Sequence, residues 1–181
     1  MKRLLAIFAI LLYTILLAPQ TIFSLPAPAN PVWPEYVVHK VKRGHTLSMI
    51  SRLYGVAVEE IKKENGLTKT VILVGQGLKI KPKYRPALVS WYGEAFAGKP
   101  MASGEIFYPK NYLVAHKTLP LGTWVELKNP HNEQRIVLQV KDRGPYVGRR
   151  EFDLSEAAAE FLETKEAGVT KILVKIVALP S

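Results

Sequence analysis

The stretch WVELKNPHNEQRIVLQV, residues 124–140, decides the fold class of the C-terminal half of the chain. Its two ends, Trp124 to Leu127 and Ile136 to Val140, are rich in strand-forming residues, and a polar cluster separates them. Short runs of this kind between turn clusters are typical of β-strands. The same pattern recurs from Val89 to Val177, so we expect this segment to be mainly β, with roughly six strands.

One helix is expected to interrupt these strands. Asp153 or Ser155 can cap a helix running from Glu156 to Glu163, and the acidic Glu156 suits the positive end of the helix dipole. Six short strands with a single helix predict a small closed barrel. Such a barrel leaves room for an open groove across its face.

A joint rich in proline and lysine, Lys81 to Pro86, separates this segment from one with a different periodicity. Proline fixes φ and biases the preceding residue away from the helical region, so we divide the chain here. We expect a first module at residues 36–82, a linker at 83–87 and the barrel at 88–178. A proline-containing spacer, residues 30–35, precedes the first module.

The first module is expected to run strand, helix, helix, strand. Residues 36–41 have the β-branched character of a strand, and Thr46 can cap a helix that Gly55 ends. A second short helix ends at residues 65–66. Residues 71–81 then form a loop and a closing strand.

These residues resemble a known module. VKRGHTLSMISRLYGVAVEEIKKENGL, residues 41–67, and VGQGLKI, residues 74–80, are similar to a LysM module, an α+β fold of βααβ order. Two positions depart from the family pattern. His45 stands where the family usually has an acidic residue, and Ala57 stands where a Ser or Thr usually caps the second helix.

The LysM resemblance implies a shallow groove for glycans that contain N-acetylglucosamine. The residues that would form this groove are Gly44, Thr46, Leu47, Val71 and Ile72. An alternative is that Leu47 and Ile72 are core residues and that Gly44 is only a turn glycine.

Three candidate catalytic residues lie in polar clusters of the second segment. Cleavage of a glycosidic bond needs a carboxylic acid to protonate the leaving oxygen, and a second group often assists. Glu105, His116 and Asp142 supply these types of side chain. The alternatives are ordinary: an ion pair of Asp142 with Arg143, a structural histidine and a solvated glutamate.

The strings SWYGEAFAGKPMASGE (90–105), AHKTLPLGTWVELKN (115–129) and VKDRGPYVGRREFDLSEAAAEFL (140–162) resemble the RlpA family. The resemblance covers residues 88–177 and implies a six-stranded double-psi β-barrel, a fold also seen in expansins and some endoglucanases. Characterised members are endolytic lytic transglycosylases that cut peptidoglycan glycan strands, preferring stretches without stem peptides. Met101 departs from the pattern, because the family more often has Thr there.

The RlpA resemblance implies roles for the candidate residues. Asp142 would be the acid that protonates the oxygen between N-acetylmuramic acid (MurNAc) and N-acetylglucosamine (GlcNAc), and would then take a proton from the muramoyl C6 hydroxyl. The product would be a 1,6-anhydro-MurNAc end, with Glu105 and His116 in supporting positions. The runner-up function is a non-catalytic, expansin-like wall-binding protein. A simple hydrolase using Asp142 and Glu105 comes third.

Three aromatic residues are candidates for stacking on sugar rings: Trp91, Tyr92 and Tyr146. An aromatic residue in a small barrel is as often part of the core, so both interpretations stay open.

The N-terminus has the pattern of an export signal. Lys2 and Arg3 precede the mostly apolar run from Leu4 to Ala18, which is shorter than the roughly 20 residues that span a bilayer. We expect a signal peptide at residues 1–29, cleaved before Asn30. An uncleaved membrane anchor is the alternative. The protein is therefore expected outside the cytoplasm, in the periplasm, the cell wall or the extracellular space.

Composition excludes several classes of protein. The 181 residues contain no cysteine, which excludes disulfides, cysteine-ligated zinc, a thiol nucleophile and lipoprotein anchoring. The net charge of +10 favours an anionic environment, and no nucleic-acid-binding motif is present. The four histidines lack metal-ligand spacing, so no metal and no cofactor is expected. The expected partner is peptidoglycan, and the oligomeric state is left open.

Overall fold

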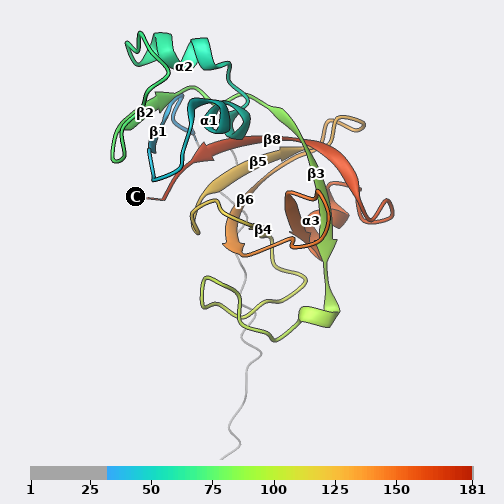
Figure 1. The fold of residues 1–181 in the computed structure, drawn as a ribbon. Helices are drawn as coiled ribbons and strands as arrows, with labels where there is room; N and C mark the ends of the chain where they lie inside the picture. The colour runs from blue at the N-terminus through green and yellow to red at the C-terminus, as the bar shows by residue number, and fades with distance from the viewer. Residues whose placement is uncertain (1–31, 181) are drawn as a thin grey trace, which may run out of the picture.

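The computed structural model describes residues 32–180, which form a small α+β module packed against a β-barrel (Figure 1). The expected signal peptide, residues 1–29, lies outside the described residues. Within residues 32–180, no helix combines the length and the apolar character needed to cross a membrane.

The N-terminal module has the expected order of strand, helix, helix, strand. Its elements are β1 (Val37–Lys40), α1 (Leu47–Tyr54), α2 (Val58–Glu64) and β2 (Gly77–Ile80). The two strands pair antiparallel, with Val37 opposite Ile80. Leu78 and Ile80 of β2 are buried in the core.

Local signals explain where the two helices begin and end. Thr46 Oγ1 accepts a hydrogen bond from the Met49 N–H at 3.2 Å, and Gly55 ends α1 in the left-handed conformation at φ 66°. The N-cap position of α2 is Ala57, which makes no side-chain capping bond. At its other end, the Asn65 side-chain amide donates to Lys79 O at 2.8 Å and accepts from the Lys79 N–H at 2.7 Å, which joins α2 to β2.

The second module is a closed six-stranded barrel, which confirms the expected fold class. Its strands are β3 (Arg85–Tyr92), β4 (Val114–His116), β5 (Trp124–Lys128), β6 (Arg135–Asp142), β7 (Phe152–Ser155) and β8 (Thr170–Ala178). Around the barrel they follow the order β3-β7-β4-β6-β5-β8. The pairs β3–β7 and β4–β6 are parallel, and the others are antiparallel. A 3-10 turn, η1 (Glu94–Phe96), follows β3.

The expected helix of the barrel module is α3 (Glu156–Phe161), which ends two residues before the predicted Glu163. Ser155 is its N-cap residue but makes no capping bond. The Ser155 hydroxyl instead accepts a hydrogen bond from the Leu113 N–H at 3.3 Å, because the loop before β4 packs over the start of the helix.

The joint between the modules is shorter than the expected linker at residues 83–87. Strand β3 already begins at Arg85, where it pairs with Val174 of β8. The two modules are in direct contact, since Lys83 N–H donates to Tyr54 O and Arg85 Nε donates to Leu53 O, both at 2.9 Å. A side chain at Gly55 would meet Lys83 O at 2.9 Å, so this approach requires glycine.

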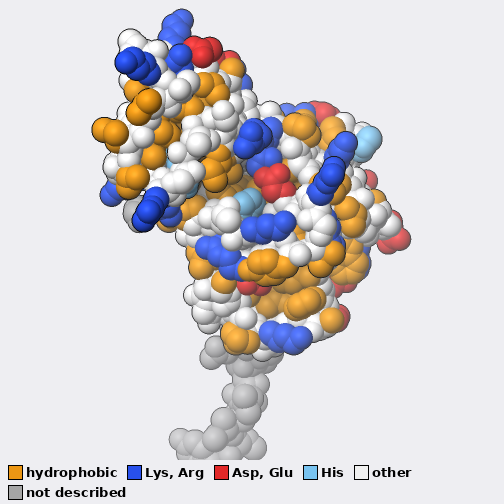
Figure 2. Space-filling view, in the orientation of Figure 1, with side chains coloured by type: hydrophobic (Ala, Val, Ile, Leu, Met, Phe, Trp, Pro, Cys, Tyr) orange, Lys and Arg blue, Asp and Glu red, His pale blue; other side chains and the backbone are white. Residues whose placement is uncertain are grey.

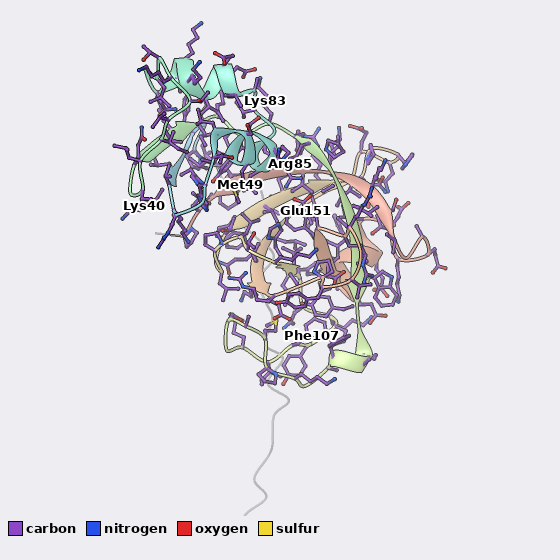
Figure 3. The ribbon with its side chains drawn as sticks, in the orientation of Figure 1. Lys40, Met49, Lys83, Arg85, Phe107 and Glu151 are labelled. Atoms are coloured by element: carbon purple, nitrogen blue, oxygen red, sulfur yellow. The ribbon has the colours of Figure 1, made fainter. Side chains whose placement is uncertain are left out.

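A second, smaller apolar cluster lies at one end of the barrel, around Phe107 (Figure 3). Phe107 is buried and stacks on Tyr92 with ring centroids 4.3 Å apart. Met101 and Leu113 complete the cluster. It anchors the turn of residues 98–107, whose two arms meet at an isolated bridge between Pro100 and Ile106.

Candidate active site

The carboxylate of Asp142 stands at the end of strand β6, where it is half-buried. Its Oδ1 accepts hydrogen bonds from the Ala102 N–H at 2.9 Å and the Arg143 N–H at 2.8 Å. Among residues 32–180 it makes no salt bridge. The Arg143 guanidinium instead donates to the carbonyls of His116 and Leu119, at 3.1 and 2.7 Å. The alternative of an Asp142–Arg143 ion pair is therefore not the arrangement found.

Glu105 lies on the turn of residues 98–107, which rests against the end of β6. The Ser103 N–H donates to Lys141 O at 3.0 Å, and the Lys141 ammonium contacts both Glu105 carboxylate oxygens at 2.9 and 2.7 Å. Lys141 immediately precedes Asp142. The structure thus brings Glu105 and Asp142 to the same strand end, with the lysine charge beside the exposed glutamate.

His116 ends strand β4, whose Ala115 pairs with Asp142 of the parallel strand β6. Its ring is buried, and Nδ1 accepts hydrogen bonds from the Thr118 and Leu119 N–H groups at 3.1 and 2.9 Å. Two donors on Nδ1 leave no place for a hydrogen there, so the neutral ring carries its hydrogen on Nε2. Among the described residues no bond joins this ring to Glu105.

Glu151 is the acidic partner of His116, and the sequence gives no sign of it. Its Oε1 lies 3.8 Å from His116 Nε2, and its carboxylate forms a bidentate pair with Arg85. Figure 3 labels Arg85 and Glu151 close to each other. Burial alone would raise the pKa of Glu151, but the hydrogen bonds and charges of His116 and Arg85 outweigh burial and lower it to about 2. Arg85 lies 66 residues away in the chain, beyond the reach of local patterns.

The depressed pKa of Glu151 predicts a stabilising contribution that is present above pH 4.5, the pKa of an ordinary glutamate, and is lost as the pH falls towards about 2. We expect about 2 kcal/mol at neutral pH, allowing for partial exposure of the carboxylate. Urea unfolding of wild type and Glu151→Gln should differ at pH 7 and converge near pH 2. Glu94→Gln, an exposed control, should follow wild type throughout. A constant difference for Glu151→Gln would contradict this pKa.

The three candidate aromatic residues have different surroundings. Trp91 packs partly buried against the main core, and its Nε1 donates to Lys165 O at 3.1 Å. Tyr92 belongs to the Phe107 cluster, and its hydroxyl is buried without a partner among the described residues. Tyr146 is 76% exposed, just beyond Asp142. Of the three, Tyr146 has the ring most open to a ligand.

The candidate groove of the N-terminal module lies where two loops meet. Hydrogen bonds of 2.8 Å join Val41 with Gly75 and Gln76, which brings the loop before α1 beside the loop before β2. Gly44 has a φ of 84°, Thr46 caps α1, Leu47 is buried in the core and Ile72 is partly buried against it. Val71 is 69% exposed, and the neighbouring Leu73 and Val74, which the sequence analysis missed, are equally open.

His45, which departs from the LysM pattern, is the partly exposed end of a polar chain that runs into the core. Its Nδ1 lies 2.9 Å from His39 Nε2, and His39 Nδ1 lies 2.9 Å from the Tyr54 hydroxyl. Burial first, and then the charges of His45 and Lys42, lower the pKa of His39 to about 4. His39 is therefore neutral at neutral pH and can join its two neighbours by hydrogen bonds.

Comparison with known families assigns both modules. Residues 87–174 match the family described as lytic transglycolase, and residues 39–81 match the LysM domain. The probable endolytic peptidoglycan transglycosylase RlpA of Treponema pallidum is 49% identical over 83 residues, which are 46% of this chain and 26% of that protein. The chain combines a LysM domain with an RlpA-family barrel. The family resemblance read from the sequence is thereby confirmed.

The RlpA-family barrel has a second relative in Aquifex aeolicus, also described as a probable endolytic peptidoglycan transglycosylase RlpA. It is 44% identical over 100 residues, which are 55% of this chain and 44% of the relative. The chain therefore spans less than half the length of each of these two proteins. Among solved structures, the Streptomyces papain inhibitor matches at 27% identity and a TM-score of 0.42, covering 52% of this chain and 94% of the inhibitor.

Proposed function

We propose that this protein is an exported, endolytic lytic transglycosylase that cleaves the MurNAc–GlcNAc bonds of peptidoglycan, acts best on strands poor in stem peptides and leaves 1,6-anhydro-MurNAc ends. The observation that carries the proposal is the carboxyl of Asp142, which stands at a strand end beside the turn that bears Glu105 and, among residues 32–180, pairs with no arginine. The relatives described as RlpA transglycosylases support the reaction class.

The hydrogen bonds of Asp142 favour one carboxyl oxygen as the proton carrier. Because two backbone N–H groups already bond to Oδ1, the acid proton resides on Oδ2. Asp142 gives this proton to the bridging oxygen as the bond from that oxygen to MurNAc C1 breaks. The muramoyl C6 oxygen then attacks C1, and the Asp142 carboxylate takes up the C6 hydroxyl proton. The acid is regenerated, and no water is consumed.

The supporting residues act through position and charge. Glu105, held by Lys141, places a carboxylate beside the reacting sugar, where it can bond to sugar hydroxyls. The His116 ring is fixed with its Nε2 hydrogen as a donor, which suits it to hold a hydroxyl or Glu151 rather than to accept a proton. Tyr146 offers an open ring for stacking, and the LysM domain holds the strand.

The test is the chemistry of the released sugar. Purified sacculi, with and without prior removal of stem peptides by an amidase, are digested and the products identified by mass spectrometry. We expect anhydro-muramoyl ends, in larger amounts from the stripped sacculi. Reducing ends would indicate a hydrolase and refute transglycosylation. Binding to sacculi without any soluble sugar would indicate the non-catalytic, expansin-like alternative.

A further inference from the structure

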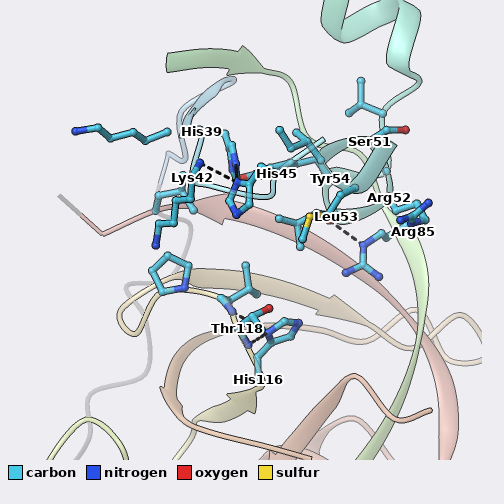
Figure 4. Close-up of a pocket in the computed structure, with 18 of the residues that line it drawn as sticks. His39, Lys42, His45, Ser51, Arg52, Leu53, Tyr54, Arg85, His116 and Thr118 are labelled. Carbon is cyan, nitrogen blue, oxygen red and sulfur yellow. Dashed lines mark hydrogen bonds between the residues drawn. The ribbon is translucent and has the colours of Figure 1, made fainter. Parts of the chain in front are cut away.

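A cleft of about 1140 Å³ separates helix α1 of the LysM domain from the barrel. Figure 4 shows His116 and Thr118 on the barrel wall, facing His45 and Leu53 on the LysM wall. Its volume exceeds that of typical small-ligand sites, so it has room for several sugar rings. The residues that line the cleft do not include Asp142, Val71 or Ile72. The cleft is therefore distinct from the proposed catalytic acid and from the part of the LysM groove formed by residues 71 and 72.

The cleft is lined by uncompensated positive charge. Lys42, Arg43 and Arg52 are exposed in its wall, and none of them forms a salt bridge among residues 32–180. Glu151 is the one acidic residue in the described lining, and Arg85 already neutralises it. In Figure 2, Lys and Arg side chains of both modules border the notch between them. This arrangement favours an anionic ligand.

The cleft also offers apolar and hydrogen-bonding surface of the kind that sugars use. Met49 on the LysM wall is 44% exposed, and the partly exposed Pro120 lines the barrel wall opposite. Apolar side chains can cover the C–H face of a sugar ring, and the fixed Nε2–H of His116 can bond to a hydroxyl. The lining therefore combines cationic, apolar and donor groups.

The two walls are held at a fixed separation. Arg85 donates to Leu53 O on the LysM side and pairs with Glu151 on the barrel side, while Lys83 bonds to Tyr54 O and pairs with Glu60. The close approach at Gly55 adds a third contact. Because the modules cannot move apart without breaking these contacts, the cleft is present whenever the protein is folded.

We propose that this inter-module cleft binds a segment of glycan strand through the free lactyl carboxylates of MurNAc. In a strand with stem peptides the lactyl carboxyl is consumed in an amide bond, whereas a stripped strand presents one carboxylate per disaccharide. Neutral chitin-type chains present none. The proposal rests on the proposed function for its choice of glycan, and it supplies a physical reason for a preference for stripped strands.

Binding is measured in the Asp142→Asn background, so that turnover does not consume the ligand. The probes are amidase-stripped peptidoglycan strands and a neutral GlcNAc oligomer of similar length. Arg52→Glu should weaken binding of the stripped strands roughly fivefold to tenfold at low salt, with little effect on the neutral oligomer. Arg52→Gln, which adds no acid at the end of α1, should give a smaller loss in the same direction.

Lys63→Glu is the matched control, because Lys63 is an exposed lysine in the last turn of α2 and does not line the cleft. It should change either affinity less than about twofold. Equal losses for Arg52→Glu and Lys63→Glu, or an equal loss for the neutral oligomer, would overturn the proposal. Melting curves verify that each variant is folded.

A thiol reporter tests the barrel wall independently, because the chain has no cysteine of its own. Stripped strands should slow maleimide labelling of Thr118→Cys several-fold and leave labelling of Lys63→Cys unchanged. Adding Arg52→Glu should remove the protection at position 118. Unprotected labelling of Thr118→Cys would refute the site. If these effects appear but the wild-type protein releases no anhydro sugars, the cleft proposal stands and the transglycosylase proposal falls. If anhydro sugars are released but these effects are absent, the transglycosylase proposal stands and the cleft proposal falls.

Discussion

Asp142→Asn should lower the release of anhydro-muramoyl sugars from stripped sacculi at least about 100-fold. Asparagine retains an oxygen that can accept the Ala102 and Arg143 N–H bonds, so the strand end and the turn against it should keep their geometry. What it lacks is an acidic proton for the leaving oxygen. The release rate, followed by mass spectrometry, measures the effect.

The same variant should still sediment with sacculi, because the LysM domain is untouched. Glu166→Gln, an equivalent carboxyl-to-amide change at an exposed position that takes no part in the proposed chemistry, should release sugars at the wild-type rate. Wild-type release by Asp142→Asn would mean that another group protonates the glycosidic oxygen.

Phe107→Ala should destabilise the barrel by about 3 kcal/mol and reduce sugar release even at temperatures where the protein is folded. Phe107 is buried against Tyr92 and bonds through its backbone to Gly98 and Lys99. Its removal leaves a cavity under the turn that carries both Glu105 and the Ala102 N–H donor to Asp142. Chemical denaturation measures the stability, and the sacculus assay measures the release.

Phe96→Ala is the control for the effects of Phe107→Ala on stability and on sugar release. Phe96 contacts the same Tyr92 ring, at 5.8 Å between centroids, but is 49% exposed. Its replacement should cost less than about 1 kcal/mol and leave sugar release near wild type. Equal costs for the two phenylalanines would show that the buried cluster does not hold the turn.

The sequence located the candidate carboxylates but not the partners that define their environment. Glu105 and Asp142 lie at one strand end, which is consistent with their proposed roles, but no local pattern indicates that Lys141 pairs with Glu105. The resemblance implies a supporting position for His116, whose Nε2 lies 3.8 Å from Glu151 Oε1. For Trp91 and Tyr92 the sequence allows both stacking and core roles, and both side chains are partly buried.

The sequence by itself determined the order of elements, the cap at Thr46, the stop at Gly55 and the two family assignments, because these depend on residues a few positions apart. Only the tertiary structure decided which charges meet. The pairs Glu105–Lys141 and Arg85–Glu151 join residues 36 and 66 positions apart. Such contacts form only when the barrel closes, so no local pattern records them. The inter-module cleft is likewise decided by the tertiary structure, because its two walls come from modules that are separate in the sequence.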